Sequence, residues 1–224
     1  MLALSAFAAT ALARDPPPIE RLGDERFRIG SIVVDKAQNR FTVPATILHL
    51  DQALEYVAVT RGGHKGYESL LELDATAHEF QLACILIGLD DAKSVKPRYQ
   101  FDEREALGQA VDITLSWPEG DGTVTVDAAN ALLEGDQPFD NNSWVYVGSM
   151  FENNGELMAE TIGTLIGFVH DPYSIIDHRF GAGVGAYGLI TGNAGLLPPK
   201  GSPLTVTIGV GPTQPSETKG KASK

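Results

Sequence analysis

The residues of this sequence best suited to chemistry lie in one glycine-rich turn, within the stretch RGGHKGYESLLELD at positions 61–74. Its candidate side chains are those of His64, Lys65, Tyr67 and Glu68. A glutamate beside a cationic turn stays ionised and can hold an amine, a metal ion or a backbone donor. Glycines and polar side chains also occur in turns that only join two strands, and this structural arrangement is the more common one. The four residues are therefore candidate binding residues, with a purely structural turn as the alternative.

A second group of ionisable residues lies at the two ends of the segment DPYSIID, positions 171–177. They could offer a metal ion two nitrogen and two oxygen ligands, from His170, Asp171, Asp177 and His178. Asp171 can instead cap a short helix that has a proline in its first turn, with the histidines at the surface. A metal site around the glycine-rich turn would draw on His64, Glu68 and His78. Spacing does not show whether such side chains converge, so all seven are candidate ligands.

Several familiar cofactor and catalytic patterns are not met. The single cysteine, Cys84, lies in the apolar run LACILIG and cannot supply the four thiolates of an iron–sulfur cluster, so a buried, inert thiol is predicted. Gly183, Gly185 and Gly188 have the spacing of a dinucleotide fingerprint, but the flanking sequence lacks its strand, helix and acidic residue. The motifs HExxH and GxSxG are absent. We therefore expect neither an iron–sulfur cluster nor a bound dinucleotide.

Composition and charge limit the class of partner. The 224 residues are 43% hydrophobic and carry a net charge of −12. A hydrophobic content of this size supports a globular core, while the negative charge disfavours nucleic acids and anionic membrane surfaces. An unknown protein or a small ligand is the partner we expect.

The N-terminus has the features of an export signal. Residues 1–13 are apolar or small and end in Ala11-Leu12-Ala13, which predicts a signal peptide cleaved before Arg14, although no basic residue precedes the apolar run. That run is too short to span a bilayer, and no other run reaches the required length. We expect a periplasmic or secreted protein, with a proline-rich linker at 14–25, one domain at 26–210 and a disordered basic tail at 211–224.

The expected fold is α+β, mainly an antiparallel β-sheet built from hairpins. The predicted hairpins pair 27–35 with 40–48, 55–60 with 67–73, and 111–117 with 123–127. Pro44 places its strand at an edge or a bulge. Thr76 and Glu79 form a capping-box pattern that opens one buried helix at about 76–88, ended by Gly88. Short helices are expected near 127–134 and 171–177.

Short motifs along the chain, taken in order, resemble those of the YdjY-type domain family. In the first half they are Glu55-Tyr56, Gly63 with Lys65, Glu68-Ser69-Leu70-Leu71 and the helix ending LACILIGL. In the second half they are WVYVGS (144–149), Ala159-Glu160, Asp171-Pro172, Ile175-Ile176-Asp177 and LPPKG (197–201). The resemblance runs from about residue 27 to residue 210 and implies an exported or periplasmic bacterial protein.

The resemblance also carries one departure and one label that does not fit. Some members of the family are labelled as ferredoxins, which the single Cys84 does not support in this chain. The family's usual histidine before the glutamate is Tyr67 here, and a histidine stands at His64 instead. If that His–Glu pair were a metal or acid–base dyad, this chain has lost it or moved it.

Three functions remain open at this point. The leading hypothesis is an exported acidic domain that binds a partner or a small ligand without catalysis, near the turn Gly62–Glu68. The first alternative is a metal-dependent hydrolase with its site around His64 and Glu68, which requires a pocket that holds Glu68 and at least one histidine. The second alternative is a structural module of the bacterial envelope.

Overall fold

The computed structural model describes residues 17–139, 142–153 and 155–212. The expected signal peptide, residues 1–13, and residues 213–224 of the expected tail lie outside the described residues. No helix in the described part of the chain is long and apolar enough to cross a membrane.

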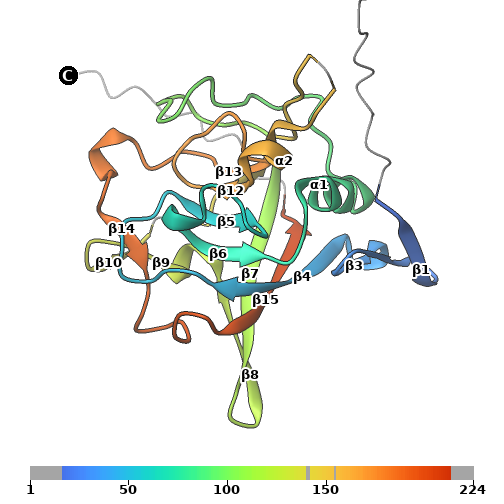
Figure 1. Cartoon of the computed structure of the whole chain (residues 1–224), viewed down its shortest axis with the longest axis horizontal. Helices are drawn as coiled ribbons and strands as arrows, with labels where there is room; N and C mark the ends of the chain where they lie inside the picture. Colours follow the sequence, from blue (N-terminus) through green and yellow to red (C-terminus); the bar gives the residue numbers. More distant parts are fainter. Residues whose placement is uncertain (1–16, 140–141, 154, 213–224) are drawn as a thin grey trace, which may run out of the picture.

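Eight strands form a closed, mixed β-barrel at the centre of the protein (Figure 1). In order around the barrel they are β4 (Arg40–Ile47), β15 (Pro203–Val210), β7 (Gln109–Glu119), β11 (Trp144–Tyr146), β13 (Ile176–His178), β12 (Thr164–Gly167), β5 (Tyr56–Thr60) and β6 (Ser69–Leu73). The barrel closes because β4 pairs with β15 and also with β6. Two of the pairings are parallel, β12 with β13 and β5 with β6.

Shorter elements extend and cover this barrel. An antiparallel arm leads into β4 and consists of β1 (Ile19–Gly23), β2 (Arg26–Ile29) and β3 (Ile32–Asp35). Strand β8 (Gly122–Asp127) pairs with β7, and their hairpin projects from the barrel in Figure 1. A separate three-stranded sheet contains β9 (Leu132–Glu134), β10 (Gln137–Pro138) and β14 (Ile190–Gly192). The 3-10 turns are η1 (Lys36–Gln38), η2 (Gly66–Glu68), η3 (Ala128–Ala131) and η4 (Val184–Ala186).

The helix α1 (Ala77–Leu86) begins as the sequence predicts. The Thr76 hydroxyl accepts from the backbone N–H of Glu79, and the Glu79 carboxylate accepts from the backbone N–H of Thr76. The helix packs against β3, β12 and the second helix, α2 (Met158–Ile162), and Phe80 meets Phe41 of β4 edge-on. It is not buried on every side, because the side chain of Ile85 is 51% exposed. One face of α1 therefore completes the core and the other meets solvent.

Pro44 occupies a central barrel strand, where the sequence predicted an edge or a bulge. Strand β4 pairs with β3 through residues 40–42 and with β6 through residues 45–47, along the same side. Pro44 lies between these two stretches, where its missing N–H costs no ladder hydrogen bond. Its carbonyl oxygen still accepts from the backbone N–H of Asp74. A change of partner strand thus accommodates the proline.

The strand and hairpin predictions are confirmed in part. The pairing of β7 with β8 is the predicted hairpin of 111–117 with 123–127. The expected hairpin of 55–60 with 67–73 is wrong, because β5 and β6 run parallel. The connection between them passes through the turn and η2 and returns the chain to the start of β5 before β6 begins, so that Ser69 pairs with Tyr56.

The predicted short helices and the linker also need correction. The Asp171 carboxylate accepts from the backbone N–H of Tyr173 and forms a tight turn rather than a helix cap, so residues 176–178 are free to pair as β13. The region 127–134 contains the 3-10 turn η3 and then strand β9. Residues 19–23 of the expected linker form β1, since they find an antiparallel partner in β2.

Candidate functional site

The structure divides the four predicted binding residues between two environments. His64 lines a surface pocket. The side chains of Lys65 and Glu68 form an ion pair at 2.5 Å and are largely covered, while Tyr67 is 60% exposed. The ammonium of Lys65 lies 5.7 Å from the centre of the Tyr67 ring. Since Glu68 does not line the pocket of His64, the turn does not present both residues to one ligand.

The pocket beside His64, here called the turn pocket, has a volume of about 430 Å³. It lies between the turn after β5, the start of α1 and the end of α2. Its lining comprises Gly30, Ser31, Thr60, Arg61, Gly62, Gly63, His64, Asp74, Ala75, Thr76, Glu79, Glu160, Thr161 and Gly163. These residues are mostly polar or small, so the pocket suits a ligand held by hydrogen bonds and charge.

Two glycines in contact form one side of this pocket. Gly163 has a φ of +90°, and a Cβ on it would lie 2.6 Å from the Cα of Gly63. The carbonyl oxygen of Gly163 accepts from the backbone N–H of Thr60 at 2.8 Å. A side chain at Gly163 would therefore separate the end of α2 from the end of β5.

The carboxylates of the turn pocket are held by specific donors. Glu160 accepts from the backbone N–H groups of Ala77 at 2.8 Å and His78 at 3.2 Å, and its carboxylate lies 3.1 Å from Nδ1 of His78. Asp74 accepts from the hydroxyl of Ser31 at 2.6 Å and pairs with Arg61. These bonds fix the carboxylates in place at the pocket wall.

Two buried acidic residues, Glu55 and Asp171, lie near Lys65 and Glu68. Glu55 is 6% exposed and accepts from the side-chain amide of Gln100 at 2.7 Å. Burial, and next the charge of Glu68, raise the pKa of the Glu55 carboxyl. The Tyr56 hydroxyl donates to Asp171 at 2.9 Å. Burial also raises the pKa of Asp171, although its hydrogen bonds act in the opposite direction.

The predicted metal ligands do not converge as histidine–carboxylate sites. Both ring nitrogens of the buried His170 face carbonyl oxygens, that of Asp102 at 2.5 Å and that of His178 at 2.9 Å. The ring of His178 packs among aromatic rings and lies 5.2 Å from that of Trp144 and 5.1 Å from that of Phe139. Within residues 17–139, 142–153 and 155–212, no group of three or more His, Cys, Asp or Glu side chains is placed to hold a metal ion.

The residues considered for cofactors occupy structural positions. Cys84 is buried in α1, and burial raises the pKa of its thiol, as expected for an inert cysteine. The glycine-rich stretch 183–188 contains the 3-10 turn η4, and Val184 and Tyr187 within it are exposed. This stretch leads into β14 of the small sheet, not into an α-helix.

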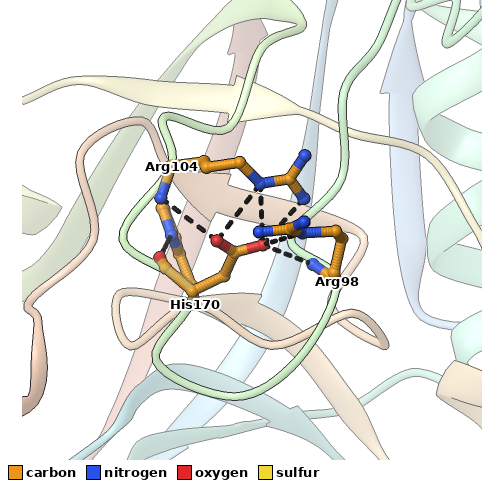
Figure 2. A network of polar contacts seen from close by, with 4 residues as sticks. Arg98, Arg104 and His170 are labelled. Carbon is orange, nitrogen blue, oxygen red and sulfur yellow. Dashed lines mark hydrogen bonds and ion pairs between the residues drawn. The ribbon is translucent and has the colours of Figure 1, made fainter.

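Sequence reasoning missed a polar network in the charged loop between α1 and β7. Asp102 is 3% exposed and accepts from Arg98 at 3.1 Å and from Arg104 at 2.7 Å. Figure 2 shows both guanidinium groups and His170 around this point. The hydrogen bonds from Arg104 and then from Arg98 hold the pKa of Asp102 below its usual range. The close spacing RYQFDER, positions 98–104, was the available signal.

The same loop contributes a half-buried lysine. Lys96 donates to the carbonyl oxygen of Gly148 at 2.5 Å. Burial lowers the pKa of Lys96 to about 8, against the charges of Asp177, Asp91 and Asp171, which raise it. The loop is therefore anchored over the barrel by its charged residues.

Comparisons with known proteins agree with the motifs in the sequence. The family description "YdjY domain" matches residues 32–209. No curated protein and no solved structure matches the chain significantly.

Proposed function

This chain belongs to the YdjY domain family, and from that premise we propose an exported, non-catalytic binding module of the bacterial envelope that holds a small cationic ligand in the turn pocket. The ligand class is one that carries an amine or a guanidinium group. Export rests on the apolar N-terminal segment and its Ala-Leu-Ala pattern.

The observation that carries the proposal is the acidic lining of the turn pocket. Asp74, Glu79 and Glu160 contribute carboxylates to it. The cationic side chain in the lining, Arg61, is paired with Asp74, and His64 adds an imidazole at the rim. A cationic group entering the pocket gains attraction from the carboxylates there, and the net charge of −12 adds long-range attraction.

The geometry favours binding over the hydrolase alternative. A hydrolase built on His64 and Glu68 needs both side chains at one reacting centre. In the structure, Glu68 is paired with Lys65 at 2.5 Å and does not line the pocket of His64. Metal content of the purified, untagged protein beside Glu68→Ala tests this alternative directly. Stoichiometric zinc or iron that disappears in the variant would revive the hydrolase.

Titration calorimetry with a panel of small amines tests the binding proposal. We expect agmatine, ethylenediamine and spermidine to bind, and their uncharged alcohol analogues to fail. Glu160→Gln and Asp74→Asn remove one charge each and keep the shape, and each should weaken binding roughly 5- to 10-fold at low salt. Glu119→Gln, at the exposed end of β7, is the matched control. Equal binding by the amines and the alcohols, or by all variants, would refute the proposal.

A further inference from the structure

Asp177 lies on the outer face of the barrel, under the charged loop. In β13 its neighbours Ile176 and His178 face the core side, because successive residues of a strand alternate. Asp177 is the register partner of Val145 in β11 and of Gly167 in β12. Val145 packs in a small cluster with Ala106 and Val147, apart from the main core. The loop that contains Ala106 thus covers this face, and Asp177 is 0% exposed beneath it.

The carboxylate of Asp177 is buried without hydrogen-bond partners among the described residues. Neither of its oxygens has one, and the hydroxyl of the fully buried Ser174 also has none. A buried polar group without a partner is costly, and a buried carboxylate more so. Ser174 and Asp177 are three positions apart in one segment. Because the buried oxygens of both side chains lack a hydrogen-bond partner in the described part of the chain, they point to a shared ligand.

The oxygens converge beside Gly167, at a position where there is no room for a side chain. The point where a Cβ on Gly167 would lie is 2.8 Å from Oγ of Ser174 and 2.9 Å from Oδ1 of Asp177. The carbonyl oxygen of Val169 is 3.3 Å from the same point. Three oxygens from three residues therefore lie close together, and we call this group of oxygens the Asp177 site.

The ionisable groups around the site carry a net negative charge when all of them are ionised, although burial raises the pKa of Asp177 and favours its neutral form. Asp171 is near enough that its charge, after burial, raises the pKa of Asp177, and the charge of Lys96 opposes this. Lys96 directs its ammonium to the carbonyl of Gly148 and gives Asp177 no hydrogen bond. Two carboxylates against one ammonium give a net charge of −1 when all three are ionised.

We propose that the Asp177 site binds an alkali cation, sodium or potassium, through the carboxylate of Asp177, the hydroxyl of Ser174 and the carbonyl of Val169. An all-oxygen set suits a hard cation. The His170 nitrogens, which a transition metal would prefer, are engaged with carbonyl oxygens. A single positive charge balances the local −1, so the proposal commits to a monovalent ion.

Thermal unfolding at constant ionic strength tests the proposal on the full chain. Chloride salts of sodium, potassium and N-methylglucamine are compared, with calcium as a separate arm. At ten times the dissociation constant, the bound ion should raise the Tm by roughly 3–6 °C over N-methylglucamine. A larger effect of sodium or of potassium identifies the ion. Equal Tm values in the three monovalent salts, or an effect of calcium alone, would overturn the proposal.

Two variants test whether an ion-dependent Tm shift arises at the Asp177 site. Gly167→Ala keeps the carboxylate but places a methyl group 2.8 Å from Oγ of Ser174 and 2.9 Å from Oδ1 of Asp177, which must displace these oxygens. Ser174→Ala removes the hydroxyl. Each variant should abolish or strongly reduce the ion-dependent Tm shift. Glu160→Gln, in the turn pocket, and the exposed Asp112→Asn should keep it, so failure of this site is distinguishable from failure of the turn pocket. An ion-dependent shift that survives in Gly167→Ala would place the ion elsewhere and refute the assignment. If a variant does not fold, sodium-23 relaxation of the wild-type protein, with potassium as competitor, gives the same answer.

Discussion

The carboxylate of Glu160 lies at the N-terminus of α1, where it accepts a hydrogen bond of 2.8 Å from the backbone N–H of Ala77. The first amides of a helix have no partner within the helix, and its dipole favours a negative charge there. Glu160 belongs to α2, which is 83 residues away in sequence. One side chain therefore joins the two helices and forms part of the wall of the turn pocket.

We predict that Glu160→Ala lowers the free energy of unfolding by about 1–2 kcal/mol, because two backbone N–H groups lose their acceptor. Glu160→Gln keeps an acceptor and loses the charge, so its cost should be about 0.3–1 kcal/mol. Urea unfolding followed by circular dichroism measures both. An Ala variant as stable as the exposed control Glu119→Gln would show that this contact contributes nothing to stability.

Local signals in the sequence were sufficient for some elements. The capping box of Thr76 and Glu79 lies within four residues, and the structure has it as predicted. The link from Glu160 to α1 could not be predicted, because it depends on tertiary packing between segments 83 residues apart. The parallel pairing of β5 with β6 was missed for a similar reason, since a short polar connection usually signals a hairpin.

The candidate site shows the same division between local and tertiary information. The sequence indicated that Glu68 would lie beside a cationic turn, and Glu68 pairs there with Lys65, three residues away. It did not indicate that the pocket would contain His64 without Glu68, because Glu68 ends the 3-10 turn η2 and is paired with Lys65 away from that pocket. The parallel pairing of β12 with β13 brings Gly167 beside Asp177, and no local pattern encodes that neighbourhood.

Gly163→Ala should be strongly destabilising, by about 2–5 kcal/mol. The backbone there has a φ of +90°, and the new Cβ would lie 2.6 Å from the Cα of Gly63, so strain and overpacking add. Gly185→Ala is the matched control, since a Cβ there meets nothing within 4 Å, and it should change stability by less than about 0.5 kcal/mol. Similar urea midpoints for the two variants would contradict the close contact of the glycines.

Tyr56→Phe should destabilise the protein in a pH-dependent manner. The hydroxyl donates to Asp171 at 2.9 Å, and its loss leaves a buried carboxylate with fewer donors, at a cost of about 1–3 kcal/mol near neutral pH. Burial already raises the pKa of Asp171 above 3.8. The folded state therefore binds more protons than the unfolded state, and stability falls as the pH rises from 3.8 through the folded pKa.

Because the variant raises the pKa of Asp171 further, this fall should be steeper in Tyr56→Phe than in the wild type. Urea unfolding at about pH 4 and about pH 7 measures the difference. Asp171→Asn in the Tyr56→Phe background should remove the added pH dependence. A destabilisation that is equal at the two pH values would show that the hydroxyl does not act through the ionised carboxylate.

Asp102→Asn should lower stability at neutral pH and flatten the acid limb of the stability curve. The hydrogen bonds from Arg104 and then Arg98 lower the pKa of Asp102 from 3.8. A carboxyl with a lowered folded pKa contributes stability that is present above its unfolded pKa and is lost as the pH falls through the folded pKa. The wild-type contribution should therefore decline below about pH 4 and be absent from the variant.

Urea midpoints measured from about pH 7 down to about pH 2.5 provide the comparison. Parallel curves for wild type and Asp102→Asn would show that the arginines do not stabilise this loop through the charge of Asp102. Because the carbonyl of the same residue contacts the His170 ring, the histidine's ring proton resonances should shift in the variant if the loop moves.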